Sequence, residues 1–503
     1  MKADARPQQT ADARTAVLTL ILLATLIRLG FAGALGLGVD ESYMVAAGRQ
    51  LHWSYFDHPP ASWWLQWGAA HLFGTEAPLA VRAPFILCFA LSTWLMYRLG
   101  AATASERAGF WAALALNLSP VFGVTTGTWV LPDGPLDAAL LGAALCLVYA
   151  LPSRGRAAWS WWVGAGLCAG LALFSKYTAV LTIGGAFFYL LTSPPHRHWL
   201  RHPAPYLAGA IVLVIFSPVV VWNATHGWAS FAFQGDRAGD LAFRPGQFFV
   251  VLGGEALFVL PWIWLGMLLA CLPVIRSPHA DWRWWLLVCL AAPPIVVFAL
   301  VAVWSGHRVL FHWAAPGYLM LFPLLGAWIA EREALPWMRR TVWATTALVL
   351  IVVAIISAQV RLDFLHPVIA AVAREDPDLE AIDWTSLRTE LVRRNLLPPG
   401  TVVGVANWRD TGKIAYALGP DVTVTCLCSD PRELGFAHPA SDYIGRNILV
   451  LALDHPERVY RELTPLFDAA IPHPALAITL DGRTIQPVTA FTGLHLRGVP
   501  SAG

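Results

Sequence analysis

The sequence has little charge. Only 13% of its 503 residues are Asp, Glu, Lys or Arg, whereas 57% are hydrophobic and 25 are Trp. This composition excludes an ordinary soluble protein and indicates a polytopic membrane protein. The formal net charge is only +2. No nucleic-acid partner is therefore expected.

Other signals are also missing. No small-residue cleavage site follows the first apolar stretch, so 16–37 is interpreted as a retained first helix. The C-terminal part has no Gly-rich phosphate-binding fingerprint, which leaves a nucleotide-sugar site there without support. A single residue separates Cys426 from Cys428, a spacing that we expect to be too tight for a mutual disulfide. The other five cysteines are expected to be core residues: Cys88, Cys146, Cys168, Cys271 and Cys289.

Long apolar runs predict a polytopic α-helical membrane protein with about eleven transmembrane helices. The runs are 16–37, 82–99, 107–123, 134–151, 159–174, 177–192, 205–222, 247–275, 283–304, 313–330 and 341–360. The predicted membrane domain is 1–360, with a first outer loop at 38–81. Basic residues cluster in alternate loops, beginning with the N-terminus. The positive-inside rule therefore predicts a cytoplasmic N-terminus.

Charge rises after 360, and 361–503 is predicted to be a soluble α/β domain outside the cytoplasm. Its expected strands are 401–405, 422–426, 448–453 and 477–480, and its expected helices are 386–396, 411–418 and 456–467.

The most unusual polar residues lie in the first outer loop. Asp40 and Glu41 come directly after the first apolar run, and Asp57 and His58 follow in a Tyr-Phe-Asp-His-Pro-Pro segment. Ionisable groups at a membrane helix end indicate a functional site, although a solvated loop is the simpler alternative for a single Asp. The Trp-rich stretch 61–73 is predicted to be a helix in the membrane interface.

Further polar residues are predicted on the same outer face. Asp133 lies in a Pro-Asp-Gly turn, and Lys176 interrupts a long apolar stretch, where it is either a snorkelling side chain or a cation for an anionic group. Arg237 lies in a later outer loop. The loop 305–312 holds three further candidate residues for a metal or phosphate site: His307, Arg308 and His312. The alternative is an ordinary solvated loop.

An enzyme site on the outer face has no access to cytoplasmic nucleotides, so its activated substrate is expected to be lipid-linked. For a sugar, the expected carrier is a polyprenyl phosphate. Transfer needs a carboxylate to take the proton of the acceptor hydroxyl and cations to stabilise the leaving phosphate. We predict Asp40 as the base with Glu41 and Asp133 as further catalytic carboxylates. The predicted phosphate-binding residues are His58, Lys176, Arg237 and Arg308.

No cofactor is expected to be obligatory, and Asp57, His307 and His312 are candidate ligands for a divalent metal ion. Direct displacement would invert the anomeric centre, and a covalent intermediate would retain it. The carboxylates present suit either route, and inversion is the simpler one.

The chain resembles the GT-C membrane glycosyltransferases of the bacterial family 39/83 group. That group includes relatives of the dolichyl-phosphate-mannose protein mannosyltransferases, the aminoarabinose lipid A transferase and the rhizobial galacturonosyltransferases. Asp40-Glu41 looks like their Asp-Glu motif, in which the Asp is the proposed base. The segment 55–60 looks like their Tyr-Phe-acidic-basic-Pro-Pro segment, with His58 where a family Lys contacts the lipid phosphate. The acidic position there, Asp57 in this chain, helps to hold a metal ion in the aminoarabinose transferase.

Further segments carry the resemblance along most of the chain. Asp133 resembles the second outer-loop Asp, 170–177 resembles the Lys-containing turn, and 311–318 resembles a His-Trp-X-Ala-Pro-X-Tyr segment. The resemblance implies a bacterial inner-membrane enzyme with a periplasmic C-terminal domain. It implies a polyprenyl-phosphate-linked sugar donor and a lipid, glycan or protein acceptor.

Two other classes compete with this interpretation. A transporter or flippase of a lipid-linked envelope precursor would place polar groups near the bilayer midplane and would show repeated halves. A receptor or scaffold would use the C-terminal domain and would not need Asp40. Substitution of Asp40 separates both from an enzyme.

Overall fold

The computed structural model describes residues 5–236, 242–365, 381–453, 455–480 and 483–500. The chain divides into two compact units, each built from several stretches of sequence. The first unit contains 1–30, 53–62 and 83–352, and the second contains 31–52, 63–82 and 353–503. Most of the first outer loop therefore groups with the C-terminal part. The predicted domain boundary after residue 360 had grouped this loop with the membrane helices.

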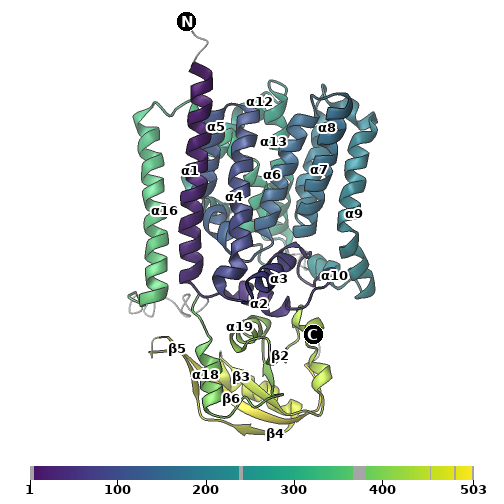
Figure 1. Cartoon of the computed structure of the whole chain (residues 1–503). Coiled ribbons are helices and arrows are strands. Elements are labelled where there is room, and N and C mark those ends of the chain that lie inside the picture. Colours follow the sequence, from purple (N-terminus) through teal and green to yellow (C-terminus); the bar gives the residue numbers. More distant parts are fainter. Residues whose placement is uncertain (1–4, 237–241, 366–380, 454, 481–482, 501–503) are drawn as a thin grey trace. The chain divides into compact units, whose positions relative to one another are not determined.

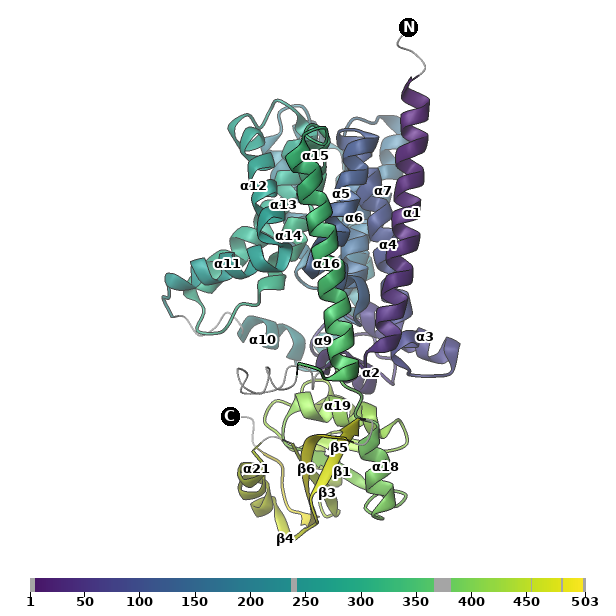
Figure 2. The same ribbon diagram turned by 90° about the vertical axis from the view of Figure 1, so that its left-hand side faces the viewer.

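The first unit is a helical bundle whose long helices run side by side (Figures 1 and 2). Its helices are α1 (Ala5–Ala34), α4 (Pro78–Thr103), α5 (Glu106–Leu118), α6 (Asp133–Ala150), α7 (Gly155–Ser175), α8 (Ala179–Thr192), α9 (Pro203–Thr225), α10 (Ala229–Asp236), α11 (Gly246–Val259), α12 (Pro261–Arg276), α13 (Trp282–Trp304), α14 (Ala315–Leu319), α15 (Phe322–Ala330) and α16 (Pro336–Leu362). A π-helix at Val121–Thr126 follows α5, and short 3₁₀ turns lie at Arg197–Arg201 and Phe311–Ala314. The ends of α1, α4 and α16 extend into the second unit.

Helices cover most of each of the eleven predicted apolar runs, and the runs 247–275 and 313–330 are each divided by a bend. Among the described residues, seven helices are long and apolar enough to span a membrane, or nine if each bent pair counts as one span. The bent pairs are α11 with α12, at 105°, and the Phe311–Leu319 helix with α15, at 58°. The helices α5 and α8 are shorter, with 13 and 14 residues. The fold is thus that of a multi-pass membrane protein.

Small residues allow the membrane helices to pack closely. A Cβ placed on Gly166 of α7 would lie 2.7 Å from the Cα of Ala208 in α9. A Cβ on Gly326 of α15 would lie 2.2 Å from the carbonyl oxygen of Ala108 in α5. Such contacts hold helices together where lipid is as apolar as the side chains and burial alone gives little driving force.

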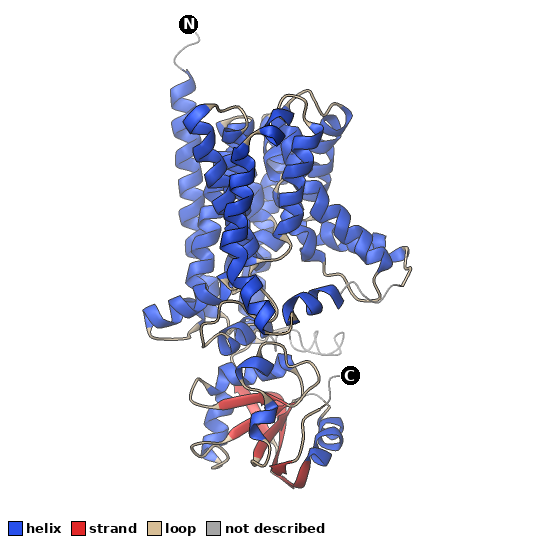
Figure 3. Cartoon of the chain, turned by 90° about the vertical axis from the view of Figure 1, so that its right-hand side faces the viewer, coloured by secondary structure: helices blue, strands red, loops and turns tan. Residues whose placement is uncertain are grey.

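The second unit contains every strand of the described residues (Figure 3). Its strands are β1 (Val402–Val405), β2 (Thr423–Cys426), β3 (Ile448–Ala452), β4 (Phe467–Pro472), β5 (Leu476–Leu480) and β6 (Arg483–Leu496). Its helices are α2 (Val39–Ala47), α3 (Ala61–Phe73), α18 (Ser386–Arg393), α19 (Trp408–Leu418), α20 (Leu434–Ala437) and α21 (Pro456–Leu463), with 3₁₀ turns at Ala440–Tyr443 and Thr464–Leu466. The first two residues of α3 are assigned to the first unit.

The sheet has the order β2-β1-β3-β6-β4, and β5 pairs with β6. The strand β1 is parallel to β2 and β3, whereas β6 is antiparallel to β3, β4 and β5. All residues of β1 and β3 are buried, as expected for parallel strands covered on both faces. The predicted α/β character of the C-terminal part is confirmed.

The prediction about Cys426 and Cys428 was wrong, because the two residues form a disulfide. Cys426 ends β2, and residues two apart on an extended chain project to the same side. Their Cα atoms are 5.3 Å apart, within the range that a disulfide can bridge.

Candidate active site

The two adjacent carboxylates of the first outer loop have opposite environments. Asp40 and Glu41 both lie in the first turn of α2, in the second unit. Negative charge is favourable there because the helix N-terminus carries a partial positive charge. Asp40 is exposed, whereas Glu41 is only 2% exposed. Asp40 is therefore the carboxylate that a substrate can reach.

Glu41 is held by Arg82, in the part of α4 that belongs to the same unit. The Arg82 Nε donates to Glu41 Oε1 at 2.8 Å, and Nη2 donates to Oε2 at 2.5 Å. The same Oε2 accepts the Gly38 backbone N–H at 2.9 Å. This bidentate geometry is the strong form of an Arg–carboxylate pair. It engages both oxygens of Glu41, which suits a positioning role better than proton transfer.

Arg82 also closes the end of α1. Its Nη1 donates to the carbonyls of Ala32 and Leu35, each at 3.0 Å, and its Nη2 donates to the carbonyl of Gly36 at 2.7 Å. The last carbonyls of a helix lack partners within the helix and need such donors. One side chain thus joins the end of α1 to the start of α2 and fixes the turn that precedes Asp40.

In the first unit, Lys176 and Asp133 form a buried ion pair. The Lys176 Nζ lies 2.8 Å and 2.9 Å from the two carboxylate oxygens of Asp133. The predicted break between two helices at Lys176 is confirmed, since α7 ends at Ser175 and α8 begins at Ala179. The predicted catalytic carboxylate Asp133 and the predicted phosphate ligand Lys176 therefore bind each other in this structure.

More candidates gather around this pair. The charge of Asp133 interacts with His58 and His312 as well as with Lys176, and Asp57 interacts with Tyr177. Burial raises the pKa of the Tyr177 hydroxyl, which lies in the turn between α7 and α8. Three other sequence candidates from distant segments therefore lie close enough to interact with the charge of Asp133, and with it they are called the cluster around Asp133: His58, Lys176 and His312.

The helix α10 holds the segment that carries Asp57 and His58. Ser230 Oγ donates to the Tyr55 carbonyl at 3.0 Å, and Gln234 Nε2 donates to the Asp57 carbonyl at 2.8 Å. The rings of Phe56 and Phe233 also pack with centroids 4.7 Å apart. These contacts fix the backbone on which Asp57, 4% exposed, is carried.

The remaining candidates lie elsewhere or outside the description. His307 and Arg308 are exposed on the loop before the Phe311–Ala314 turn, and the Arg308 guanidinium lies 5.9 Å from the Phe311 ring centroid. Arg237 falls outside the described residues.

A metal site does not fit the candidate ligands. Across the described residues, no group of three or more His, Cys, Asp or Glu side chains is arranged to hold a metal ion. Asp57, His307 and His312 therefore do not form a three-ligand site of the kind that zinc requires. No step below is routed through a metal.

Two charged residues at important positions were missed from the sequence. Arg82 was placed at the first position of an apolar run and given no role. Arg28 lies inside α1, where its Nε donates to the Gly123 carbonyl at 2.9 Å and its guanidinium lies 4.3 Å from the Phe89 ring centroid. An arginine within a membrane helix is itself a signal of function or of a buried partner. That signal was present at position 28.

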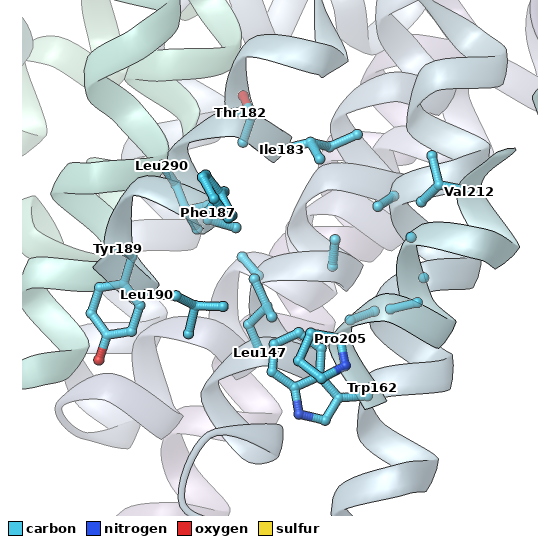
Figure 4. Close-up of a pocket in the computed structure, with 18 of the residues that line it drawn as sticks. Leu147, Trp162, Thr182, Ile183, Phe187, Tyr189, Leu190, Pro205, Val212 and Leu290 are labelled. Carbon is cyan, nitrogen blue, oxygen red and sulfur yellow. The ribbon is translucent and has the colours of Figure 1, made fainter. Parts of the chain in front are cut away.

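An apolar cavity of about 180 Å³ lies in the first unit among α6, α7, α8, α9 and α13 (Figure 4). Its lining includes Leu147, Trp162, Phe187 and Leu290. A cavity of this character is suited to a hydrocarbon rather than to a sugar or a cluster of water molecules.

Comparison with known proteins identifies the fold. Residues 57–222 match the family model described as dolichyl-phosphate-mannose-protein mannosyltransferase. ArnT from Cupriavidus metallidurans bound to undecaprenyl phosphate is similar with a TM-score of 0.64 and 16% identity, over 94% of this chain and 97% of that one. Its apo form gives a TM-score of 0.63 and 15% identity, over 95% and 98% of the two chains.

A more distant similarity is to the apo oligosaccharyltransferase of Archaeoglobus fulgidus. The TM-score is 0.50 at 13% identity, over 87% of this chain and 69% of that one. No curated protein matches the chain in sequence. At these identities the structural matches establish a shared fold, the GT-C fold that the sequence motifs predicted.

Proposed function

We propose that this chain, a multi-pass membrane glycosyltransferase of the GT-C type, moves a sugar from a polyprenyl-phosphate donor to an acceptor hydroxyl. The site is assigned to the outer face of a bacterial inner membrane, and the acceptor is a lipid, a glycan or a protein. A lipid-linked donor is supported by the undecaprenyl phosphate bound to the similar ArnT structure.

The observation that carries the proposal is the contrast between Asp40 and Glu41. The exposed Asp40 stands at the start of α2, on a backbone that the buried Glu41–Arg82 pair holds in place. A general base must reach the proton that it takes, and it works best when its position is fixed beforehand. Of the two carboxylates, Asp40 meets both requirements.

The proposed reaction is a single displacement. The acceptor oxygen attacks the anomeric carbon while its proton passes to Asp40, and the bond from that carbon to the phosphate oxygen breaks. The products are the glycosylated acceptor and the free polyprenyl phosphate, with inversion at the anomeric carbon. Glu41 is assigned to orientation of Asp40, in place of the catalytic role predicted from the sequence.

The donor phosphate is assigned to positive groups of the first unit. Lys176, His58 and His312 all interact with the charge of Asp133, and Asp137 interacts with both Asp133 and Lys176. Lys176 and the two imidazoles are the groups proposed to stabilise the charge of the donor phosphate. Arg237 and Arg308 remain further phosphate-binding proposals, and no step of the reaction uses a metal ion.

The alternation of basic loops supports the proposed orientation, with the N-terminus in the cytoplasm and the C-terminal part in the periplasm. A transporter would show broken helices at corresponding positions of two repeated halves. The two bent pairs, α11–α12 and Phe311–Leu319 with α15, instead follow one another in the second half of the chain.

Mass spectrometry of envelope glycolipids and glycans tests the proposal. A strain that lacks the protein is complemented with the native chain, with Asp40→Asn, or with Asp442→Asn as the matched control. Asp442 is exposed on the second unit at the Ala440–Tyr443 turn. A sugar mass restored by the native chain and the control, and lost with Asp40→Asn, supports the base. Full restoration by Asp40→Asn refutes it.

A further inference from the structure

We propose that the C-terminal α/β part of the second unit is a positioning element for α2, with Gly412 and Lys413 of α19 as positioning residues. The inference rests on the proposed function of Asp40. The family motif lies in the first outer loop, and nothing in it points to residues more than three hundred positions later.

The close approach of α19 to α2 depends on Gly412. A Cβ at this position would lie 2.6 Å from the Cβ of Tyr43, 2.7 Å from its Cα and 3.1 Å from its backbone nitrogen. Backbone atoms do not move aside as a flexible side chain does. Any residue other than glycine must therefore displace α19 relative to α2, three residues along the helix from Asp40.

Lys413 acts at the entrance of α2. It is 2% exposed, and its Nζ donates to the carbonyl of Leu37, which precedes the helix N-cap Gly38. The Trp384 ring lies 5.3 Å from the same Nζ. A buried ammonium is costly unless its donors are satisfied. The Leu37 carbonyl is an acceptor for this ammonium, so the same hydrogen bond holds the Leu37–Gly38 turn.

Tyr43 forms the third contact. Its hydroxyl accepts the backbone N–H of Glu433 at 2.8 Å, and its ring packs edge-on against Trp408 and Trp63, at centroid distances of 5.3 Å and 5.8 Å. The side chain is 3% exposed. The C-terminal part therefore contacts Tyr43 of α2 in two ways. The backbone of Glu433 donates to its hydroxyl, and the ring of Trp408 packs against its ring.

The far end of α2 is held as well. Arg49, two residues past the helix, donates to the carbonyls of Ala415 and Gly419 at 3.2 Å and 3.4 Å and forms an ion pair with Glu76. Tyr416 of α19 donates to the Glu76 carbonyl at 3.0 Å. Since α19 contacts both ends of α2, a shift of one helix moves the other, and Asp40 moves with it.

A catalytic group displaced by about 1 Å can lose on the order of 100-fold in rate. The expected result is a decrease in product formed per molecule of folded enzyme, at least roughly tenfold for Gly412→Ala and for Lys413→Met. Lys413→Arg, which keeps a cationic donor, should restore part of the product. Gly498→Ala is the matched control, because nothing lies within 4 Å of a Cβ at Gly498.

The experiment uses the full chain in the deletion strain described above. Product is measured by mass spectrometry and divided by the amount of membrane-inserted protein. Purified variants are also tested for a thermal shift on addition of undecaprenyl phosphate, the probe for an intact donor site. A merely structural role would lower protein amount and melting temperature, whereas a positioning role lowers product and leaves the probe-induced shift unchanged.

Each outcome has a separate meaning. Native product levels from Gly412→Ala and Lys413→Met, together with an inactive Asp40→Asn, overturn the positioning role and leave the proposed function intact. An active Asp40→Asn overturns the proposed function and this inference with it. If Gly412→Ala does not accumulate, Lys413→Met and its Arg counterpart decide the result.

Discussion

Removal of Arg82 is the sharpest test of how Asp40 is held. Arg82→Met deletes two hydrogen bonds to Glu41 and three to the end of α1, and it leaves Glu41 as a buried carboxylate without its cation. Loss of one partner of a buried ion pair typically destabilises a protein by about 3–5 kcal/mol. The side chains of Arg82 and Glu41 are only 2% and 3% exposed, so solvent screening does not reduce this figure much.

The assay is denaturation of the purified full chain in detergent, with hydrogen exchange measured on peptides that cover 31–52. Arg458→Met is the matched control, since Arg458 and Glu462 form an exposed pair worth about 0.5 kcal/mol or less. Arg82→Lys, which keeps the charge but not the planar fork, should give an intermediate loss of stability.

Three results would count against this reasoning. A loss of stability from Arg82→Met no larger than that of the control would show that the pair does not hold the α1–α2 turn. A Glu41→Gln variant with native stability but no transfer would return Glu41 to the catalytic role predicted from the sequence. Native transfer by a stable Glu41→Gln protein would show that the charge of Glu41 is dispensable.

Further predictions concern other parts of the chain. Either Lys176→Met or Asp133→Asn should destabilise the first unit by about 3–5 kcal/mol because each removes the hydrogen-bonded partner of a buried charge, and the double variant should recover part of that loss in the same denaturation assay. Burial, and then the charge of Arg49, lowers the pKa of His438, so the unfolded chain binds more protons in acid. Stability of the second unit should therefore fall as pH drops below about 6.5, and His438→Gln should flatten that dependence between pH 8 and 5.

The membrane helices were predictable because hydropathy depends on local sequence. Every apolar run is largely helical, although two of the runs are divided by a bend, and the single Lys176 was enough to place the break between α7 and α8. The 105° bend of α11 and α12 was not predicted, although Pro261 follows its corner. Leu260 adopts φ 83° there. This conformation is unfavourable for leucine, so the surrounding packing must impose it.

Local sequence also failed to predict part of the C-terminal sheet. Four buried or partly buried strands were predicted near their observed positions, but β4 and β6 were missed. The strand β4 is largely exposed, and β6 contains Pro487, so neither shows the usual pattern of a strand. Their pairing arises from contacts with β3 and with each other that no local pattern encodes.

The position of the candidate base could be predicted, but not its surroundings. Asp40 was recognisable from its place after the first helix. The different environment of Glu41 depends on Arg82, which is 41 residues away, and the setting of α2 depends on Lys413, which is 376 residues from Leu37. Such partners are determined by the three-dimensional fold, so a single sequence gives no direct indication of them.

The interleaved composition of the second unit has a consequence for biosynthesis. The ribosome makes α2 early, yet the Lys413 that contacts its entrance is separated from Leu37 by 376 residues. At about 5–20 residues per second, translation needs roughly 20–75 s to cover that distance. During this time the nascent chain holds its proposed base on a helix that has the Glu41–Arg82 pair but not yet its contacts with α19. On the proposed positioning role, a chain released before α19 is made would lack part of the support of Asp40.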